Sequence, residues 1–417
     1  MYENSFDEVY RCGRCGFCLK TCPVYQNTLR ETASPRGKVQ LIRNHAGTKL
    51  DGSAYLGSLV SCCLMCGTCT ANCPSGVRHD IIFMKMRSRM SKIHGRHWYE
   101  KVLFHFLSHE DQLRIASKFA RIGRVPPLER FVDDVKVGNI PIRRLPKFNS
   151  RPFLGRMKGS KAALGGDRGT VLYFTGCATN YVFEAVGRAV VSVLTRMGYR
   201  VEIPDSQVCC GLPLFSHGAM DMAADNILKN IDIFNREDIV AVVVDCATCG
   251  SALKKEYPIV LETLGMKVEN ALSLSEKVFD ISEFIGLHFD ALKPHLPATP
   301  KKQTTVTYHS PCHLRNHQEV SVQIEDLLND LPGVNYVRSD DAESCCGGGG
   351  TFFYDFPEGS KKIVDVKIAN AVKTGAKVWA TGCPSCRTNL SGNLSGEEGI
   401  HVLHPVELLA SIIAWDE

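Results

Sequence analysis

Short apolar runs alternate with longer amphipathic stretches after about residue 170. The runs at 171–174 and 239–244 are too short for helices, so they predict strands, of which 239–244 is buried, and a brief strand is predicted at 201–203. The intervening stretches 181–197 and about 219–235 have helical spacing of apolar residues. Strands that alternate with helices favour a parallel sheet covered by helices.

The same order of elements returns in the last quarter of the chain. Strands are predicted at 304–308, 334–337 and 377–380, with helices from Cys312 to Leu331 and over about 360–374. The pattern therefore predicts two consecutive α/β lobes.

The first third of the chain is predicted to be helical. Pro35 opens a short helix, and 80–96 forms a basic helix with Ile81, Met84 and Ile93 turned inward. Amphipathic helices follow at 98–106 and 112–122, and Pro126-Pro127 ends them. The stretch 138–169 is rich in Gly, Pro, Arg and Lys without periodicity, which is typical of a linker.

Cysteine content changes this picture from an ordinary fold to a metal-binding one. The 417 residues include 19 cysteines, far more than packing requires, while 44% apolar and 22% charged residues are ordinary for a globular protein. The start, MYENSFDEVY, lacks the basic and apolar regions of a secretory signal. We therefore expect reduced thiolates in the cytoplasm rather than disulfides.

Two N-terminal cysteine runs carry the signature C-x2-C-x2-C-x3-C-P. The runs are Cys12, Cys15, Cys18, Cys22-Pro23 and Cys63, Cys66, Cys69, Cys73-Pro74. In bacterial two-cluster ferredoxins the fourth cysteine of each run ligates the other cluster. The signature therefore predicts two cubane 4Fe-4S sites, one held by Cys12, Cys15, Cys18 and Cys73 and the other by Cys63, Cys66, Cys69 and Cys22.

A five-cysteine pattern occurs twice in the α/β region. The first copy is Cys177, Cys209, Cys210, Cys246 and Cys249, and the second is Cys312, Cys345, Cys346, Cys383 and Cys386. Matching positions are offset by 135, 136, 137 and 137 residues (177→312, 209→345, 246→383, 249→386), which indicates an internal duplication. Five thiolates per copy exceed what a tetrahedral zinc or a cubane needs, so we predict an unusual iron–sulfur cluster. A zinc site that uses four of the five thiolates is the alternative.

Side chains near these cysteines are candidates for tuning the metal. Thr175, Ser310, Thr381 and Ser385 are predicted to donate hydrogen bonds toward the sulfurs. Histidines 309, 313 and 317 flank Cys312 and could donate to sulfur, relay protons or serve a bound partner. The predicted ligands total eighteen, which leaves Cys62 as a small buried apolar residue.

Charge distribution limits the classes of partner. Residues 84–147 hold 15 Lys/Arg against 6 Asp/Glu, or +9, which leaves −4 for the rest of a chain of net charge +5. No nucleic-acid motif accompanies this basic region, so we expect no nucleic-acid role. Solvated helix faces, an acidic partner subunit or an anionic membrane face would each account for it. The apolar run 239–244 is far too short to span a membrane.

Several longer motifs resemble a known family. CGFCLKTCPVYQ, SPRGKVQLIR and CGTCTANCPSGVRHDI resemble the ferredoxin half of the iron–sulfur subunit of glycolate oxidase and lactate dehydrogenase complexes. The two later copies resemble the cysteine-rich CCG domain shared with heterodisulfide reductase and anaerobic glycerol-3-phosphate dehydrogenase. This resemblance implies that each five-cysteine set holds a noncubane 4Fe-4S cluster. Both copies keep all five cysteines here, which favours the heterodisulfide reductase members of the family.

The expected fold is α+β and α/β: an N-terminal helical two-cluster ferredoxin domain followed by a duplicated α/β CCG domain. The expected boundaries are 1–95 for the ferredoxin-like domain, 96–169 for a basic helical connector and linker, 170–300 for CCG copy one and 301–417 for CCG copy two.

The expected role is that of an iron–sulfur electron-transfer subunit. It would carry electrons from a FAD-containing 2-hydroxy acid dehydrogenase to a quinone or another acceptor, in a hetero-oligomer in the cytoplasm or at the inner face of the cell membrane. The chain has no GxGxxG-type dinucleotide fingerprint after a strand, so the flavin is expected on a partner. The alternative is a catalytic subunit that reduces a disulfide at noncubane clusters, and a zinc-stabilised scaffold is a third reading.

Overall fold

The computed structural model describes residues 6–122, 136–137, 140–141, 147–164, 166–300, 302–396 and 398–413. The predicted helix end at Pro126-Pro127 lies outside these residues. Among the described helices, none combines the length and the apolar content that crossing a bilayer requires.

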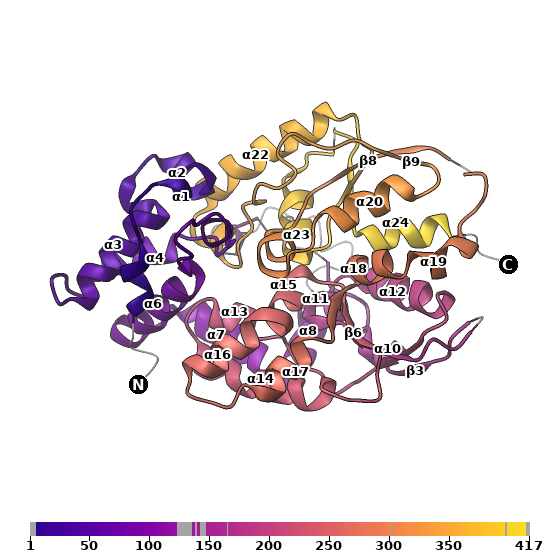
Figure 1. Cartoon of the computed structure of the whole chain (residues 1–417), viewed down its shortest axis with the longest axis horizontal. Coiled ribbons are helices and arrows are strands. Elements are labelled where there is room, and N and C mark those ends of the chain that lie inside the picture. Colours follow the sequence, from indigo (N-terminus) through magenta and orange to yellow (C-terminus); the bar gives the residue numbers. More distant parts are fainter. Residues whose placement is uncertain are drawn as a thin grey trace.

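A helical N-terminal domain packs around its own apolar core, drawn in indigo in Figure 1. Its predicted basic helix is α6, which turns Ile82, Met86 and Met90 inward, whereas Ile93 is 52% exposed. The prediction for Ile93 is therefore wrong, because this residue lies in the last turn, beyond the packed part of the helix. The elements are η2 (Asp7–Arg11), α1 (Phe17–Thr21), α2 (Pro23–Thr28), η3 (Glu31–Ala33), α3 (Pro35–Ala46), α4 (Ala54–Ser61), α5 (Thr68–Ala71) and α6 (His79–His94).

Two helices and a short edge strand connect this domain to the α/β region. The helices α7 (Trp98–Ser108) and α8 (Glu110–Ile122) agree with the predicted helices. The predicted linker is wrong in part: β1 (Lys136–Val137) pairs with β2 (Ile140–Pro141), α10 (Leu154–Met157) follows, and β3 (Gly159–Lys161) joins a sheet. An exposed edge strand needs only backbone hydrogen bonds, so it leaves no apolar pattern in the sequence.

Lobe one is built on a sheet with the strand order β3-β5-β4-β6-β7, in which only β3 runs antiparallel. Its strands are β4 (Thr170–Phe174), β5 (Arg200–Ile203), β6 (Ala241–Val244) and β7 (Val278–Asp280). Its helices are α11 (Gly176–Tyr181), α12 (Glu184–Arg196), α13 (Leu212–Phe215), α14 (Met220–Phe234), α15 (Ala247–Ser251), η5 (Ala252–Glu256), α16 (Tyr257–Thr263), α17 (Glu269–Ser275), α18 (Ile281–Leu287), α19 (Phe289–Leu292) and η6 (Lys293–His295).

Lobe two repeats this plan with the all-parallel order β11-β10-β8-β9. In both lobes the first strand is flanked by the second and the third, and the fourth lies beyond the third, so the duplication seen in the cysteines extends to the fold. The predicted helix after Cys312 is interrupted, with a π-helical turn before α20. The elements are β8 (Thr304–Tyr308), η7 (His313–His317), α20 (Val322–Asp330), β9 (Val334–Tyr336), α21 (Phe352–Asp355), α22 (Pro357–Lys373), β10 (Val378–Ala380), α23 (Pro384–Asn393), β11 (His401–Leu403) and α24 (Pro405–Ile412).

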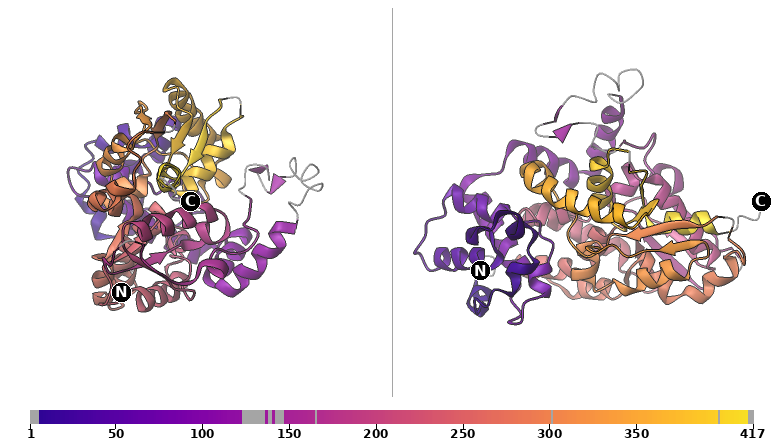
Figure 2. Two further views of the ribbon diagram at one scale, coloured as in Figure 1. Left: turned by 90° about the vertical axis from the view of Figure 1, so that its right-hand side faces the viewer. Right: turned by 90° about the horizontal axis from the view of Figure 1, so that it is seen from above.

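The two lobes share one core and the N-terminal domain sits against them. Helix α12 packs on α24, and α18 packs on α20, so apolar side chains run continuously from one lobe to the other. Helix α2 packs on α22 of lobe two, while α7 packs on α13 and α14 of lobe one (Figures 1 and 2). The predicted mixed α/β fold with mainly parallel sheets is confirmed.

Candidate metal centres

The N-terminal cysteines divide between two cavities. One cavity is lined by Cys12, Cys15, Cys18 and Cys73, and the other by Cys22, Cys63, Cys66 and Cys69. The fourth cysteine of each run thus lies with the first three of the other run. We call these groups the first and the second N-terminal sets.

Glycines let the chain turn tightly around these cavities. Gly16 directly precedes α1 and Gly67 directly precedes α5, both with positive φ, of 90° and 69°. A Cβ atom on Gly67 would lie 2.4 Å from Nε2 of His317, so the backbone beside Cys66 can reach lobe two only without a side chain.

Burial raises the pKa of several thiols of the N-terminal sets. It raises the pKa of Cys18 to about 11 and that of Cys66 to about 12. Desolvated thiols of this kind stay neutral unless a cation compensates the thiolate, which a bound metal does. The Lys38 ammonium, on α3, lies in the wall of the second cavity and donates to the carbonyl of Cys62 at 2.5 Å.

The lobe-one set lies beyond the carboxyl ends of β4 and β6. Contacts between thiols link Cys177 to Cys209, Cys209 to Cys210, and Cys210 through Cys249 to Cys246. Hydrogen bonds from the neighbouring thiols of Cys209 and Cys249 lower the pKa of Cys210. Paired parallel strands end at the same sheet edge, and this brings residues about 70 positions apart together.

The lobe-two set repeats this order of contacts. The thiol of Cys312 contacts Cys345, and Cys346 reaches Cys383 through Cys386, with 3.2 Å between the sulfurs of Cys346 and Cys386. Two backbone N–H groups point at this set, from Gly347 to Cys345 Sγ at 3.5 Å and from Gly348 to Cys346 Sγ at 3.4 Å.

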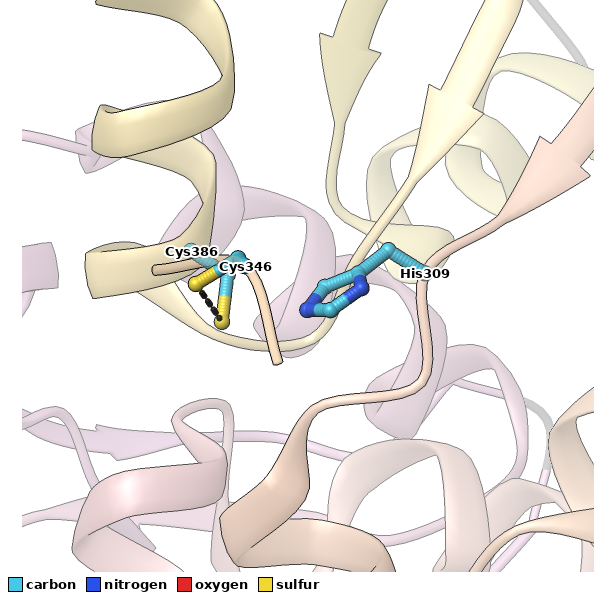
Figure 3. Close-up of side chains that lie close together, drawn as sticks. All are labelled: His309, Cys346 and Cys386. Carbon is cyan, nitrogen blue, oxygen red and sulfur yellow. Dashed lines mark hydrogen bonds between the residues drawn. The ribbon is translucent and has the colours of Figure 1, made fainter. Parts of the chain in front are cut away.

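His309 faces the lobe-two set from the end of β8 (Figure 3). One ring nitrogen and the sulfurs of Cys346 and Cys386 all lie within 4.8 Å of one another. The imidazole is fully buried, and neither ring nitrogen has a hydrogen-bond partner within the part of the chain that the structure describes. A buried polar group without a partner is costly, so this ring is suited to face a bound anionic group.

The five-thiol sets fit iron–sulfur clusters by their chemistry. All 19 cysteines are free, and all ten in the lobes are buried or nearly so. Thiols in mutual contact without disulfides, with N–H donors aimed at the sulfurs, form a donor set suited to a thiolate-ligated cluster.

The other predicted donors give a mixed result. The hydroxyls of Ser310 and Thr381 are buried and have no hydrogen-bond partner among the described residues, as expected for donors to a bound acceptor. The prediction is wrong for Thr175, whose amide and hydroxyl both donate to the side chain of Gln207. The ring of His313 lies 3.6 Å from the sulfur of Cys312 and stacks on His317.

His317 connects lobe two to lobe one. Its Nδ1 lies 2.7 Å from the buried carboxylate of Glu256, and Ser251 donates to the same carboxylate. Burial acts to raise the pKa of Glu256, but the contacts with His317, His313 and Ser251 together keep it below its usual value.

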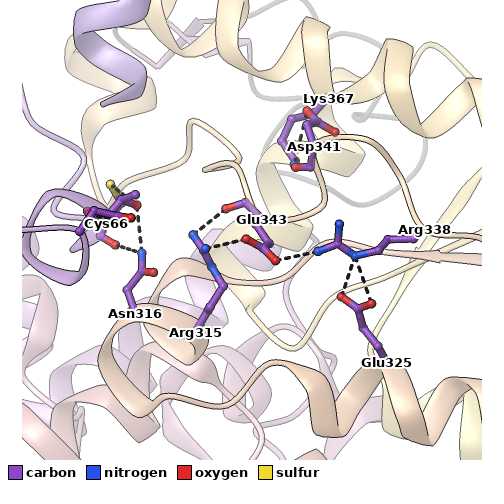
Figure 4. Close-up of polar contacts among 10 residues, drawn as sticks. Cys66, Arg315, Asn316, Glu325, Arg338, Asp341, Glu343 and Lys367 are labelled. Atoms are coloured by element: carbon purple, nitrogen blue, oxygen red, sulfur yellow. Dashed lines mark hydrogen bonds and ion pairs between the residues drawn. The ribbon is translucent and has the colours of Figure 1, made fainter. Parts of the chain in front are cut away.

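Some functional side chains left no signal in the sequence. Lys367, on α22, is buried, donates to the carbonyl of Asp341 at 2.6 Å, and brings positive charge toward Cys346. Asn316 donates to the carbonyl of Cys66 at 2.8 Å across the domain junction (Figure 4). Neither belongs to a cysteine motif, so only the tertiary fold reveals them.

The four sets form a continuous row. The Cys18 and Cys22 thiols are close enough to interact electrostatically, and the same is true of Cys66 with Cys312. A third such pair, Cys246 with Cys383, joins the two lobes, where the amide of Ala247 also donates to the carbonyl of Gly382 at 2.9 Å. The order is therefore first N-terminal set, second N-terminal set, lobe-two set and lobe-one set.

Comparison with family models identifies the parts of the chain. Residues 8–77 match the 4Fe-4S dicluster domain, and residues 171–254 and 306–391 each match the cysteine-rich CCG domain. These matches cover the N-terminal cysteine runs and both five-cysteine copies, and they indicate iron–sulfur clusters.

Curated relatives align over most of the chain. The Probable glycolate oxidase iron-sulfur subunit of Bacillus subtilis is 29% identical over 96% of this chain and 93% of its own length. One subunit of the dihydromethanophenazine:CoB–CoM heterodisulfide reductase of Methanosarcina acetivorans is 26% identical over 97% of this chain and 94% of its own length. Lactate utilization protein A of Oceanobacillus iheyensis is 31% identical over 57% of this chain and 96% of its own length. The chain therefore belongs to the family of cysteine-rich CCG iron–sulfur proteins that includes these relatives.

Proposed function

We propose that this protein is an electron-transfer subunit of an oxidoreductase complex. The row of four cysteine sets carries the proposal, because thiols of successive sets lie close enough to raise each other's pKa along the whole row. When bound, iron–sulfur clusters supply one-electron carriers. The cysteine thiolates would hold the clusters, and the surrounding side chains would exclude water and tune the reduction potential of each cluster.

The ligand assignment follows the four sets. The two N-terminal sets would each hold a cubane 4Fe-4S cluster, with Cys73 and Cys22 as the crossed ligands. Each lobe set would hold a noncubane 4Fe-4S cluster through five cysteines. Zinc in one lobe set is the competing assignment.

The electron donor is proposed to be a separate flavoprotein that oxidises a 2-hydroxy acid such as glycolate or lactate. Two relatives are named for glycolate oxidase and lactate utilization, and the sequence has no dinucleotide fingerprint of its own. The acceptor would be a quinone or another carrier, reached at the inner face of the cell membrane in a hetero-oligomer.

Elemental and spectroscopic analysis of anaerobically prepared protein tests this function. Four filled sites give about sixteen iron and sixteen acid-labile sulfur atoms per chain. Reduction by a low-potential dye should then produce interacting paramagnetic centres, and the reduced protein should pass electrons to a second dye. Near-zero iron, zinc as the main metal, or clusters that cannot be reduced would each overturn the proposal.

Disulfide reduction in the lobes is the second candidate function. Both five-cysteine sets are complete, and the imidazoles of His309 and His313 lie beside the lobe-two set. A heterodisulfide reductase subunit is among the relatives. Turnover of a disulfide by the isolated chain with reduced dye would favour this function, whereas a simple relay would oxidise the dye only with an added acceptor.

A further inference from the structure

A cleft of about 630 Å³ opens where the N-terminal domain, helix α7 and the two lobes meet. Its walls come from α4 and α6 of the N-terminal domain, from Tyr99 and Glu100 of α7, from His217 of lobe one and from residues 349–356 of lobe two. Cys63, a member of the second N-terminal set, forms part of the same wall. The cleft is separate from the metal centres, because the two N-terminal sets line their own cavities and the thiols of each lobe set contact one another.

Aromatic rings form one side of the cleft. The rings of Tyr99 and Tyr354 lie 5.0 Å apart, and those of Phe352 and Phe356 lie 5.1 Å apart. A volume of this size with aromatic walls and a few convergent polar groups is typical of sites for small organic ligands. A flat ring is the shape that such walls accept.

Polar side chains on the other side are joined by a chain of hydrogen bonds. The Tyr99 hydroxyl donates to Asp355 at 2.5 Å, and Asp355 also lies 2.5 Å from the hydroxyl of Thr351. Thr351 in turn lies 2.9 Å from Nε2 of His217, whose Nδ1 is 2.8 Å from the carbonyl of Pro213. The chain therefore runs from exposed Asp355 to partly buried His217.

Hydrogen counting shows that this chain accommodates one extra proton. Four contacts join its members, but ionised Asp355 and neutral His217 leave only three hydrogens, on Tyr99, Thr351 and one imidazole nitrogen. A fourth proton, on Asp355, completes every contact, whereas burial and the nearby Arg87 charge lower the pKa of His217 to about 4 and disfavour a second proton on that ring. Glu100 lines the same cleft, and burial raises the pKa of its carboxyl.

We propose that this cleft binds a quinone and that the chain from Asp355 to His217 supplies protons to it. The inference rests on the proposed electron-transfer function and gives its quinone acceptor a binding site and a source of protons. A quinone takes up two electrons and two protons, and an O–H bond forms at each carbonyl oxygen. The electrons are those that the set containing Cys63 carries when loaded, and the protons come from water by way of Asp355 and Glu100.

Binding can be tested with ubiquinone-1 and menadione on the full chain. Trp98 is adjacent to Tyr99, so its fluorescence should be quenched as the quinone binds. Ser58 is exposed and lines the cleft, so Ser58→Trp fills the space without removing any packing. We expect at least tenfold weaker binding in Ser58→Trp by calorimetry. Tyr55→Trp, on the same helix but outside the cleft, is the matched control and should bind as the unaltered protein does.

Proton supply is tested by the ratio of two rates on one sample. Quinol formation needs protons, whereas ferricyanide reduction takes electrons alone. Because a positioned acid or base contributes about 10²- to 10⁴-fold in rate, Asp355→Asn should slow quinol formation at least tenfold relative to ferricyanide reduction. Glu358→Gln, an exposed carboxylate outside this cleft, should leave the ratio unchanged.

The outcomes separate this inference from the proposed function. Full iron content and normal dye relay with no quinone binding, or with equal binding in Ser58→Trp, overturn the quinone site alone. Tighter binding of FMN than of either quinone overturns the class of ligand. An unaltered protein that holds no iron or does not relay electrons between dyes refutes the electron-transfer function itself. Calorimetry still shows in that case whether the cleft binds a quinone.

Discussion

The two lobes share a strand order and a cysteine pattern, but their sulfurs have different neighbours. At the offset of 135 residues that relates Cys177 to Cys312, His309 corresponds to Phe174 and His313 to Ala178. Both Phe174 and His309 are fully buried. Lobe two thus presents imidazoles where lobe one presents a benzyl group and a methyl group.

Lobe two also places a positive charge near its cysteines where lobe one has an apolar side chain. Lys367 lies on α22 of lobe two, and at the offset of 136 residues its counterpart on α14 is Ile231. Cations and N–H donors stabilise the reduced, more negative state of a cluster. We therefore expect the lobe-two site to be the more easily reduced of the pair.

The coverings of the lobes differ as well. Lobe one packs its cysteines under Phe104 and Leu107 of α7 in one apolar cluster. Lobe two packs Cys312 and Cys345 with Leu64 and Cys66 of the N-terminal domain. The two copies therefore share the order of their thiol contacts, while the residues that surround the thiols differ.

Removal of one thiol from either lobe should have the largest effect. Cys346→Ser and Cys210→Ser should each lose about four of sixteen iron atoms, since a cluster that lacks a ligand is not retained. Iron and sulfide assays measure this loss. Cys62→Ser is the control and should keep all of its iron. Equal iron in all three variants would show that these thiols are not ligands.

Substitution of Gly67 should weaken the contact between the N-terminal domain and lobe two. Gly67→Ala adds a Cβ 2.4 Å from His317, whereas Gly375→Ala, at nearly the same φ of 68°, meets no described residue within 4 Å. Both substitutions carry the cost of positive φ, and overpacking should add about 1–3 kcal/mol for Gly67 alone. Urea unfolding measures the difference, and equal stabilities would refute the close contact.

The fourth strand of each lobe ends at a buried helix cap of opposite acid–base character. Burial raises the pKa of Asp280 to about 7, with Glu283 and Asp245 adding to the effect, and burial lowers the pKa of His404 to about 3, helped by Arg387. The stability that Asp280 contributes is full below pH 3.8 and is lost as pH rises through 7. That of His404 is full above pH 6.5 and is lost as pH falls toward 3.

Conservative caps should therefore have opposite pH profiles. Asp280→Asn should gain stability relative to the unaltered protein as pH rises from 5 to 8, and His404→Asn should gain as pH falls from 7 to 5. One group changes the unfolding free energy by at most about 1.4 kcal/mol per pH unit. Chemical unfolding at each pH checks this, and parallel profiles for both variants would contradict it.

Exchange of the buried ring should give the smallest effect. His309→Phe makes lobe two resemble lobe one and should lower the potential of its centre by tens of millivolts, roughly 1 kcal/mol of lost electrostatic stabilisation. Phe174→His should raise the potential in lobe one. Redox titration followed by electron paramagnetic resonance measures both, and a rise in His309→Phe would reverse the proposed order of the lobes.

Much of the fold was predictable from local patterns. Apolar strands such as β6 and the helices α7 and α14 were predicted within a few residues, because buried runs and helical periodicity leave a direct trace. The edge strand β3 and the π-helical turn at 313–317 were not predicted. Their stability comes from backbone pairing and from packing against other segments, which no local pattern records.

The sequence by itself determined which thiols belong together, because thiolate ligation needs cysteines at short, repeated spacings on a turning chain. Only the tertiary structure decided the order of the four sets, the difference between His309 and Phe174 as neighbours of sulfur, and the cleft beside Cys63. These depend on contacts between segments far apart in the chain, such as Asn316 with Cys66, 250 residues away. Such contacts are selected by the shape and burial of whole domains, and spacing along the sequence does not encode them.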